Sequence, residues 1–162
     1  MERLSQRPAV QIDDERHDRF LATGDERQPF HPNPIAHRVL ADHLEEVVSL
    51  IRARCKPTSV LLTGSFGRGE GSVLVDGGAV DVLSDIEVAV VSKHPNDRGQ
   101  VREIGTRLSE SSGIDTCVFW LRSDSLKRWR IKSFSFGKQP LSVKVYDILA
   151  GSRLLWGEPI DI

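Results

Sequence analysis

The chain has little cysteine, no excess of either charge and no long apolar run. Two cysteines in 162 residues are too few for a disulfide framework. With 22 basic and 23 acidic side chains, no overall field selects a nucleic acid or a membrane surface. The apolar runs are too short to span a bilayer, and the charged N-terminus lacks a signal-peptide pattern. We therefore expect a cytoplasmic protein with no membrane partner, in which Cys55 and Cys117 are small core residues.

One domain, preceded by a charged arm, is the organisation that the composition predicts. Residues 1–29 are rich in charge and contain only scattered apolar side chains, so they are interpreted as a flexible N-terminal arm. Residues 30–162 are then a single domain, because a chain of this length can bury one sizeable core.

Apolar periodicity predicts an alternation of helices and strands in that domain. Asn33 and Pro34 are typical of a helix start, and apolar residues recur every three or four positions from 35 to 51. Further elements are expected as strands at 58–63, 83–91, 114–121 and 141–148, a helix at 95–112, and short helices at 66–70 and 123–129. This order predicts an α/β (α+β) fold with a small mixed β-sheet flanked by helices.

A Gly-Ser turn follows the first predicted strand. Gly64 lets a phosphate approach the backbone, exposed N–H groups at the start of the next helix can bind that phosphate, and Ser65 adds a hydroxyl donor. Arg68 is close enough in sequence to reach a triphosphate, although a solvent-exposed salt-bridging arginine is an equal alternative. Read alone, the turn is also compatible with an ordinary strand-to-helix connection. Its glycines do not follow the G-x-G-x-x-G spacing of dinucleotide-binding folds.

Two carboxylates lie two positions apart on the second predicted strand. Because side chains alternate along a strand, Asp85 and Glu87 are expected to project from the same face. Adjacent carboxylates repel each other unless a cation lies between them, and Mg²⁺ takes oxygen ligands of this kind. Asp85 and Glu87 are therefore predicted metal ligands. The alternative is a pair of surface carboxylates on a solvated sheet face.

Together, Gly64-Ser65 and Asp85-Ile86-Glu87 resemble the signature of the DNA polymerase β-like nucleotidyltransferase superfamily, and the residues after Ser65 resemble its small bacterial catalytic domains. The resemblance covers roughly residues 35–157. It implies transfer of a nucleoside monophosphate from a nucleoside triphosphate to an acceptor hydroxyl. It also implies Mg²⁺ or Mn²⁺ on the two carboxylates, and the serine on the terminal phosphates. Twenty residues separate Gly64 from Asp85, so an inserted loop is expected near 73–80. Residues 71–81 are interpreted as a glycine-rich loop or a hairpin.

The same resemblance implies a third acid on a neighbouring strand. Asp147 is the carboxylate of the predicted strand at 141–148, and it is assigned as the third catalytic residue. Lys144 lies on the other face of that strand. If the family's third acid belongs at the position of Lys144, this chain has a lysine in its place and lacks the catalytic base. The chain is then a catalytically degenerate nucleotide-binding or regulatory, antitoxin-like module. Family members commonly continue into a helical domain, so a partner helical domain or protein is expected.

The acceptor is left open between a small molecule, a protein and an RNA. From Leu121 to Lys144 the chain has seven cations and one acid, with three aromatic residues interleaved. This composition suits nucleotide phosphate or RNA, but it also suits a solvated helix face. The five histidines show no metal-ligand spacing and are interpreted as structural or surface groups.

Overall fold

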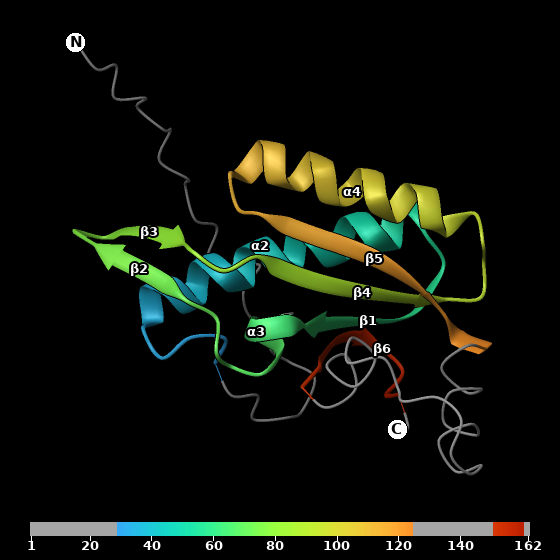
Figure 1. Cartoon of the computed structure of the whole chain (residues 1–162), viewed down its shortest axis with the longest axis horizontal. Helices are drawn as coiled ribbons and strands as arrows, with labels where there is room; N and C mark the ends of the chain where they lie inside the picture. The colour runs from blue at the N-terminus through green and yellow to red at the C-terminus, as the bar shows by residue number, and fades with distance from the viewer. Residues whose placement is uncertain (1–28, 125–150, 161–162) are drawn as a thin grey trace, which may run out of the picture.

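The computed structural model describes residues 29–124 and 151–160, which form a small mixed sheet with helices packed on it (Figure 1). Along the chain the elements are α2 (Pro34–Arg54), β1 (Pro57–Thr63), α3 (Gly64–Gly67), β2 (Val73–Asp76), β3 (Ala79–Val82), β4 (Ile86–Ser92), α4 (Asp97–Ser112), β5 (Thr116–Arg122) and β6 (Arg153–Gly157). The predicted strand at 141–148, most of the short helix at 123–129 and the arm up to residue 28 lie outside the described residues.

The main sheet has the strand order β5-β4-β1-β6. β1 pairs antiparallel with both β4 and β6, whereas β4 and β5 run parallel. A parallel pair requires a crossover, which α4 provides between β4 and β5. The predicted fold class, a mixed sheet flanked by helices, is confirmed.

Helix α2 begins where the sequence predicts. The side-chain oxygen of Asn33 accepts hydrogen bonds from the amides of Ile35 and Ala36, at 2.9 and 3.2 Å. Pro34 occupies the first helical turn, where its missing N–H leaves no helical hydrogen bond unmade. None of the helices in the described part of the chain combines the length and the apolar character needed to cross a bilayer.

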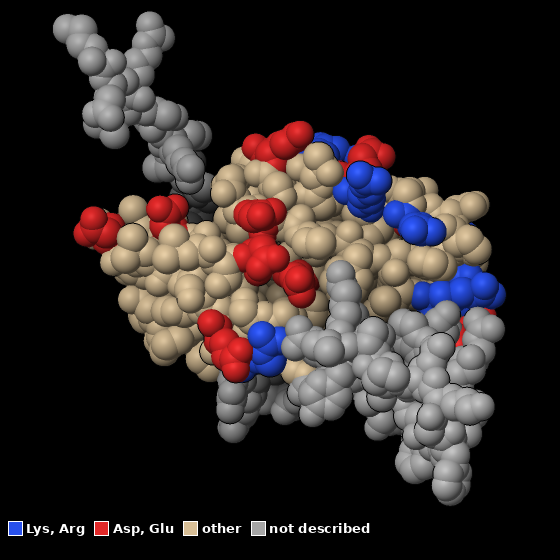
Figure 2. Space-filling model, in the orientation of Figure 1, with Lys and Arg blue, Asp and Glu red and all other residues tan. Residues whose placement is uncertain are grey.

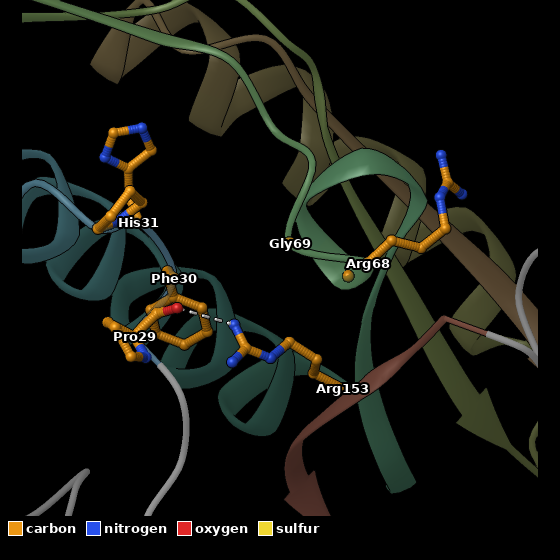
Figure 3. Close-up of a pocket in the computed structure, with 8 residues that line it drawn as sticks. Pro29, Phe30, His31, Arg68, Gly69 and Arg153 are labelled. Carbon is orange, nitrogen blue, oxygen red and sulfur yellow. Dashed lines mark hydrogen bonds between the residues drawn. The ribbon is translucent and has the colours of Figure 1, made fainter.

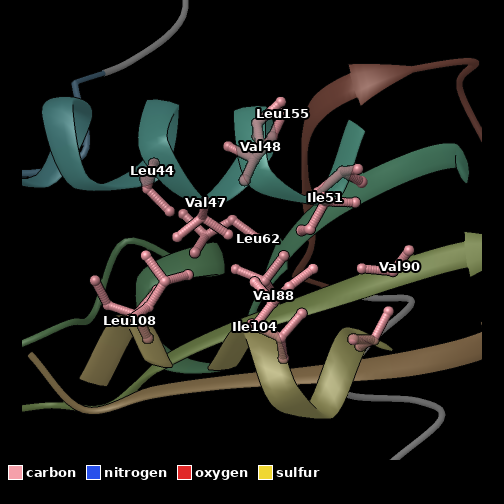
Figure 4. Packing of buried hydrophobic residues seen from close by; sticks show 14 of the residues in the cluster. Leu44, Val47, Val48, Ile51, Leu62, Val88, Val90, Ile104, Leu108 and Leu155 are labelled. Carbon is pink, nitrogen blue, oxygen red and sulfur yellow. The ribbon is translucent and has the colours of Figure 1, made fainter. Parts of the chain in front are cut away.

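Both long helices pack on one face of the sheet. Strand alternation turns Ile86, Val88 and Val90 of β4 toward α2 and α4, and all three are fully buried. In this core the β4 residues meet side chains from α2, α4, β1 and β6 (Figure 4): Leu44, Val47, Val48, Ile51, Leu62, Leu108 and Leu155. On the opposite face, Ala89 and Val91 pack with residues of the neighbouring strands in a second, smaller cluster. The helix-covered face therefore holds most of the hydrophobic contacts.

The predicted inserted loop is a β-hairpin. β2 and β3 are joined by Gly77 and Gly78, whose φ angles of 54° and 88° suit a two-residue hairpin turn. At its base, the amide of Ser72 donates to the hydroxyl of Ser84 at 3.0 Å. The hairpin projects from the end of the sheet at which β4 and β5 begin (Figure 1). The hairpin returns the chain to the sheet immediately before Asp85. Strand β4 starts at Ile86, three residues later than predicted.

One histidine is buried in the core. His43 of α2 is 5% exposed, and its Nε2 lies 2.9 Å from the hydroxyl oxygen of Thr116 on β5. Burial lowers the pKa of His43 from 6.5 to about 4, because the charged imidazolium would lose its hydration. The folded protein therefore holds this imidazole neutral at pH 7.

We predict that stability falls when His43 is forced to accept a proton. The pKa is lower in the folded state than in the unfolded state. The stability contributed by the neutral form is therefore complete above pH 6.5 and is lost as the pH falls toward 4. The full loss is about 3 kcal/mol. Urea unfolding of wild type and His43→Leu, measured between pH 7.5 and 5, should show a steeper loss of stability with falling pH in the wild type. Equal slopes in the two proteins would contradict it.

Candidate functional site

The Gly-Ser turn lies directly against the carboxylate strand. In the β1–β4 ladder Thr63 is paired with Glu87, and the Thr63 hydroxyl donates to the Glu87 carbonyl oxygen at 3.3 Å. The next residue, Gly64, has a φ of +64°. A Cβ atom added there would lie only 2.7 Å from Oε2 of Glu87. The two halves of the sequence motif thus meet at Gly64, where the positive φ favours glycine and an added Cβ atom would push the Glu87 carboxylate aside.

Asp85 and Glu87 belong to the sheet face that α2 and α4 do not cover. Ile86, between them, is fully buried against the helices, so its neighbours project to the other side. Asp85 is exposed and Glu87 is partly exposed. The structure therefore places both predicted metal ligands on one accessible face, beside the turn.

A third carboxylate, Asp115, lies at the same end of the sheet. Ile86 pairs with Thr116 in the parallel β4–β5 ladder, and the Ile86 amide donates to the Asp115 carbonyl oxygen at 2.8 Å. This register sets Asp115 next to Asp85, where it is exposed. Figure 2 shows acidic side chains gathered where β4 and β5 begin. Sequence reasoning gave Asp115 no role, although an acid at the head of the predicted strand at 114–121 was a usable signal.

The donor set fits a metal that is shared with a bound nucleotide. Within the described ranges, no three histidine, cysteine or acidic side chains lie close enough together to hold a metal ion. Mg²⁺ is usually held by one or two carboxylates, with water and substrate phosphates completing its shell. Asp85 and Glu87 can supply that pair of oxygen ligands. The site therefore suits a metal bound together with phosphates rather than one enclosed by protein groups.

The residues after Gly64 form a single tight turn, α3, and its continuation. Buried Phe66 anchors this turn in the core, while Ser65 stays partly exposed. The Glu70 amide donates to the Ser65 carbonyl oxygen, and the Arg68 guanidinium donates to the Glu70 carboxylate, both at 2.8 Å. Arg68 therefore forms a salt bridge with an acid of its own turn. Such a salt bridge was the predicted alternative to contact with a triphosphate.

A pocket of about 270 Å³ opens at the other end of the turn. Its lining comprises Pro29, Phe30, His31, Pro32, Gly67, Arg68, Gly69 and Arg153. The Arg153 guanidinium lies over the Phe30 ring at 5.2 Å and donates to the Pro29 carbonyl oxygen at 3.4 Å. The Arg68 side chain extends away from the pocket (Figure 3). Neither Asp85 nor Glu87 lines this pocket, so it is distinct from the carboxylate face.

The two cysteines have different environments. Cys55 is buried, and burial together with nearby Asp97 raises its pKa to about 11. Cys117 was also predicted to be a core residue, and this is wrong: it is exposed beside Glu87, because Thr116 takes the helix-facing position of β5.

Asp147, Lys144 and most of the basic run lie outside the described residues, so their predicted roles remain predictions.

No family model matches this chain, and the comparison with curated proteins gives no match. Among solved structures, it is similar to a toxin–antitoxin crystal structure with AMP-PNP, at 17% identity and a TM-score of 0.43 over 70% of this chain and 73% of the other. It is also similar to tri-AMPylated Shewanella oneidensis HEPN toxin in complex with MNT antitoxin, at 16% identity and a TM-score of 0.40 over 72% and 71%. With both TM-scores below 0.5, neither likeness assigns a family or an activity.

We predict that alanine at position 64 strains the turn and displaces Glu87. The positive φ alone costs about 1–2 kcal/mol for a residue with a Cβ, and the contact with Oε2 adds to this. Gly69→Ala is the matched control, because its φ is +77° but nothing lies within 4 Å of the added Cβ.

Urea unfolding should therefore show a larger loss of stability for Gly64→Ala than for Gly69→Ala. Adding Glu87→Ala should bring the Gly64→Ala loss down to the Gly69→Ala value, since the clashing carboxylate is then gone. Equal losses in the two single variants would contradict the close contact.

Proposed function

We propose that this chain is a nucleotidyltransferase-like protein. In this proposal it binds a nucleoside triphosphate with a divalent metal and transfers the nucleoside monophosphate to an acceptor hydroxyl. The main support is the packing of the Glu87 carboxylate against Gly64. Backbone that phosphates can approach and carboxylates that suit Mg²⁺ or Mn²⁺ are thereby brought side by side. The acceptor is a small molecule, a protein or an RNA.

Each group has a distinct task in this proposal. The backbone at Gly64 and the hydroxyl of Ser65 bind the terminal phosphates, and Arg68 contributes positive charge at the edge of the turn. Asp85 and Glu87 hold the metal, which when bound neutralises charge that develops on the phosphates. The rigid pairing of β1 with β4 keeps the phosphate-binding turn and the metal ligands at a fixed separation.

Asp115 is the third acid in this proposal and accepts the proton of the attacking hydroxyl. Its exposure, and its position at the head of β5 next to Asp85, support this role. An accessible carboxylate there can meet a hydroxyl that approaches the phosphates from the open face. Asp147, proposed from the sequence for the same task, stays a prediction.

A second candidate is a catalytically inactive nucleotide-binding or regulatory module on the same scaffold. The observation in its favour is the β2–β3 hairpin, which lengthens the connection between the two halves of the motif. This module would bind nucleotide and metal without releasing pyrophosphate. Turnover, rather than binding, separates the two candidates.

We predict Mg²⁺-dependent binding of a non-hydrolysable ATP analogue, measured by isothermal titration calorimetry. Asp85→Asn and Glu87→Gln keep the side-chain size but remove the charge, and each should weaken binding by about tenfold or more. Asp81→Asn, an exposed acid on the hairpin, is the matched control and should bind as the wild type does. Binding that is indifferent to Mg²⁺ and to both variants would overturn the proposed site.

We predict that Asp115→Asn retains nucleotide binding but loses turnover. Removal of a general base typically lowers the rate by about 10²–10⁴-fold. Pyrophosphate release in the presence of a panel of acceptors measures this effect. Binding without any turnover in the wild type would favour the inactive module, and a fully active Asp115→Asn would return the third acid to Asp147.

A further inference from the structure

A buried polar pair lies beneath the start of β5, on the side of the sheet away from the carboxylates. His43 and Thr116 are 5% and 4% exposed, and they join α2 to β5 across 73 positions of sequence. A buried polar group is costly unless it is hydrogen-bonded, so the 2.9 Å contact between the two is what makes their burial tolerable. Nothing in the proposed chemistry uses His43 directly.

The direction of this hydrogen bond follows from the partners of Thr116. A threonine hydroxyl has one hydrogen, and here it donates to the Ile114 carbonyl oxygen at 2.9 Å. The hydroxyl oxygen must therefore accept from the Nε2–H of His43. The Thr116 amide donates in turn to the hydroxyl of Ser109 on α4, also at 2.9 Å. Thr116 is thus hydrogen-bonded to α2, to α4 and to the connection that precedes β5.

Asp115 is the residue just before this fastened threonine. Its carbonyl oxygen accepts from the Ile86 amide of β4, so the backbone on both sides of its side chain is fixed. Adjacent strand residues project to opposite faces, and Asp115 is exposed while Thr116 is buried. The buried bond on one face therefore sets the position of the carboxylate on the other.

We infer that His43 and Thr116 are positioning residues for the Asp115 carboxylate. This inference rests on the proposed function, in which Asp115 receives the proton of the acceptor hydroxyl. An apolar pair of similar size would fill the core with little or no loss of stability. Unlike an apolar contact, a hydrogen bond is directional and holds the strand at one height and rotation, which is what a catalytic group on a strand end requires.

The test is the variant His43→Leu, measured in turnover and in hydrogen exchange. Leucine leaves Thr116 its bond to Ile114 and removes only the link to α2. The expected result is a fall in kcat of about tenfold, with the KM for nucleotide within about twofold, because a misplaced base slows the chemistry and not binding. The Ile86 amide should also exchange faster with solvent, since its acceptor is the Asp115 carbonyl.

Two controls separate positioning from a general loss of stability. Ile51→Val removes one buried methyl group elsewhere in the core, at a cost of about 0.5–1.5 kcal/mol, and should leave kcat, KM and Ile86 exchange unchanged. Thr116→Ser keeps the hydroxyl and should retain most of the turnover. Thr116→Val should lose at least as much turnover as His43→Leu, because it removes the bond to Ile114 as well as the link to His43.

The deciding measurement is a double-mutant cycle. In the Asp115→Asn background His43→Leu should cause no further loss of kcat, because the group that it positions is already gone. If the two losses multiply in an otherwise active protein, or if Ile86 exchange is unchanged in His43→Leu, the positioning role is wrong while the proposed function stands. If wild type shows no turnover, or if Asp115→Asn is fully active, the catalytic role of Asp115 fails and this inference fails with it.

Discussion

The antiparallel pairing of β1 with β4 is the contact on which the candidate site depends. It places Thr63 opposite Glu87, so the turn that leaves β1 begins against the carboxylate that projects from β4. Gly64 has no side chain, so the Glu87 carboxylate can lie where an added Cβ atom would displace it. Buried apolar side chains on the helix-facing side of both strands keep this register in place, because a slip of one residue would turn them away from the core.

The arrangement of the helices determines which face is available for chemistry. Packing of α2 and α4 on one side of the sheet buries the apolar side chains of β4 and β5 that face that side. Alternation then sends Asp85, Glu87 and Asp115 to the other side. The hairpin returns the chain at Ser84, so the first of these acids stands at the very start of the strand. The core and the proposed site are thus the two faces of the same strands.

Much of this could be predicted from the sequence, because the signals are local. Apolar spacing and the Asn33–Pro34 cap gave α2, and spacing alone gave α4 and the central strands. The two-residue interval of Asp85 and Glu87 was enough to assign them to one face. The Gly-Ser turn followed by the acidic pair also suggested phosphate and metal. For residues 71–81 the sequence left a glycine-rich loop and a hairpin as alternatives, since two glycines are compatible with several turn geometries.

The relations between segments distant in sequence follow from packing and are not contained in local patterns. The parallel register of β4 and β5 brings Asp115 beside Asp85, and periodicity within either segment contains no information on that register. The same register turned Cys117 outward and Thr116 inward, which overturned the expectation for the cysteine. His43 looked like one of five ordinary histidines until α2 was packed over β5 and gave it a buried partner. Alternation along a strand determines which face a residue shares with its near neighbours in sequence. Which strand lies beside that residue is determined by tertiary packing alone.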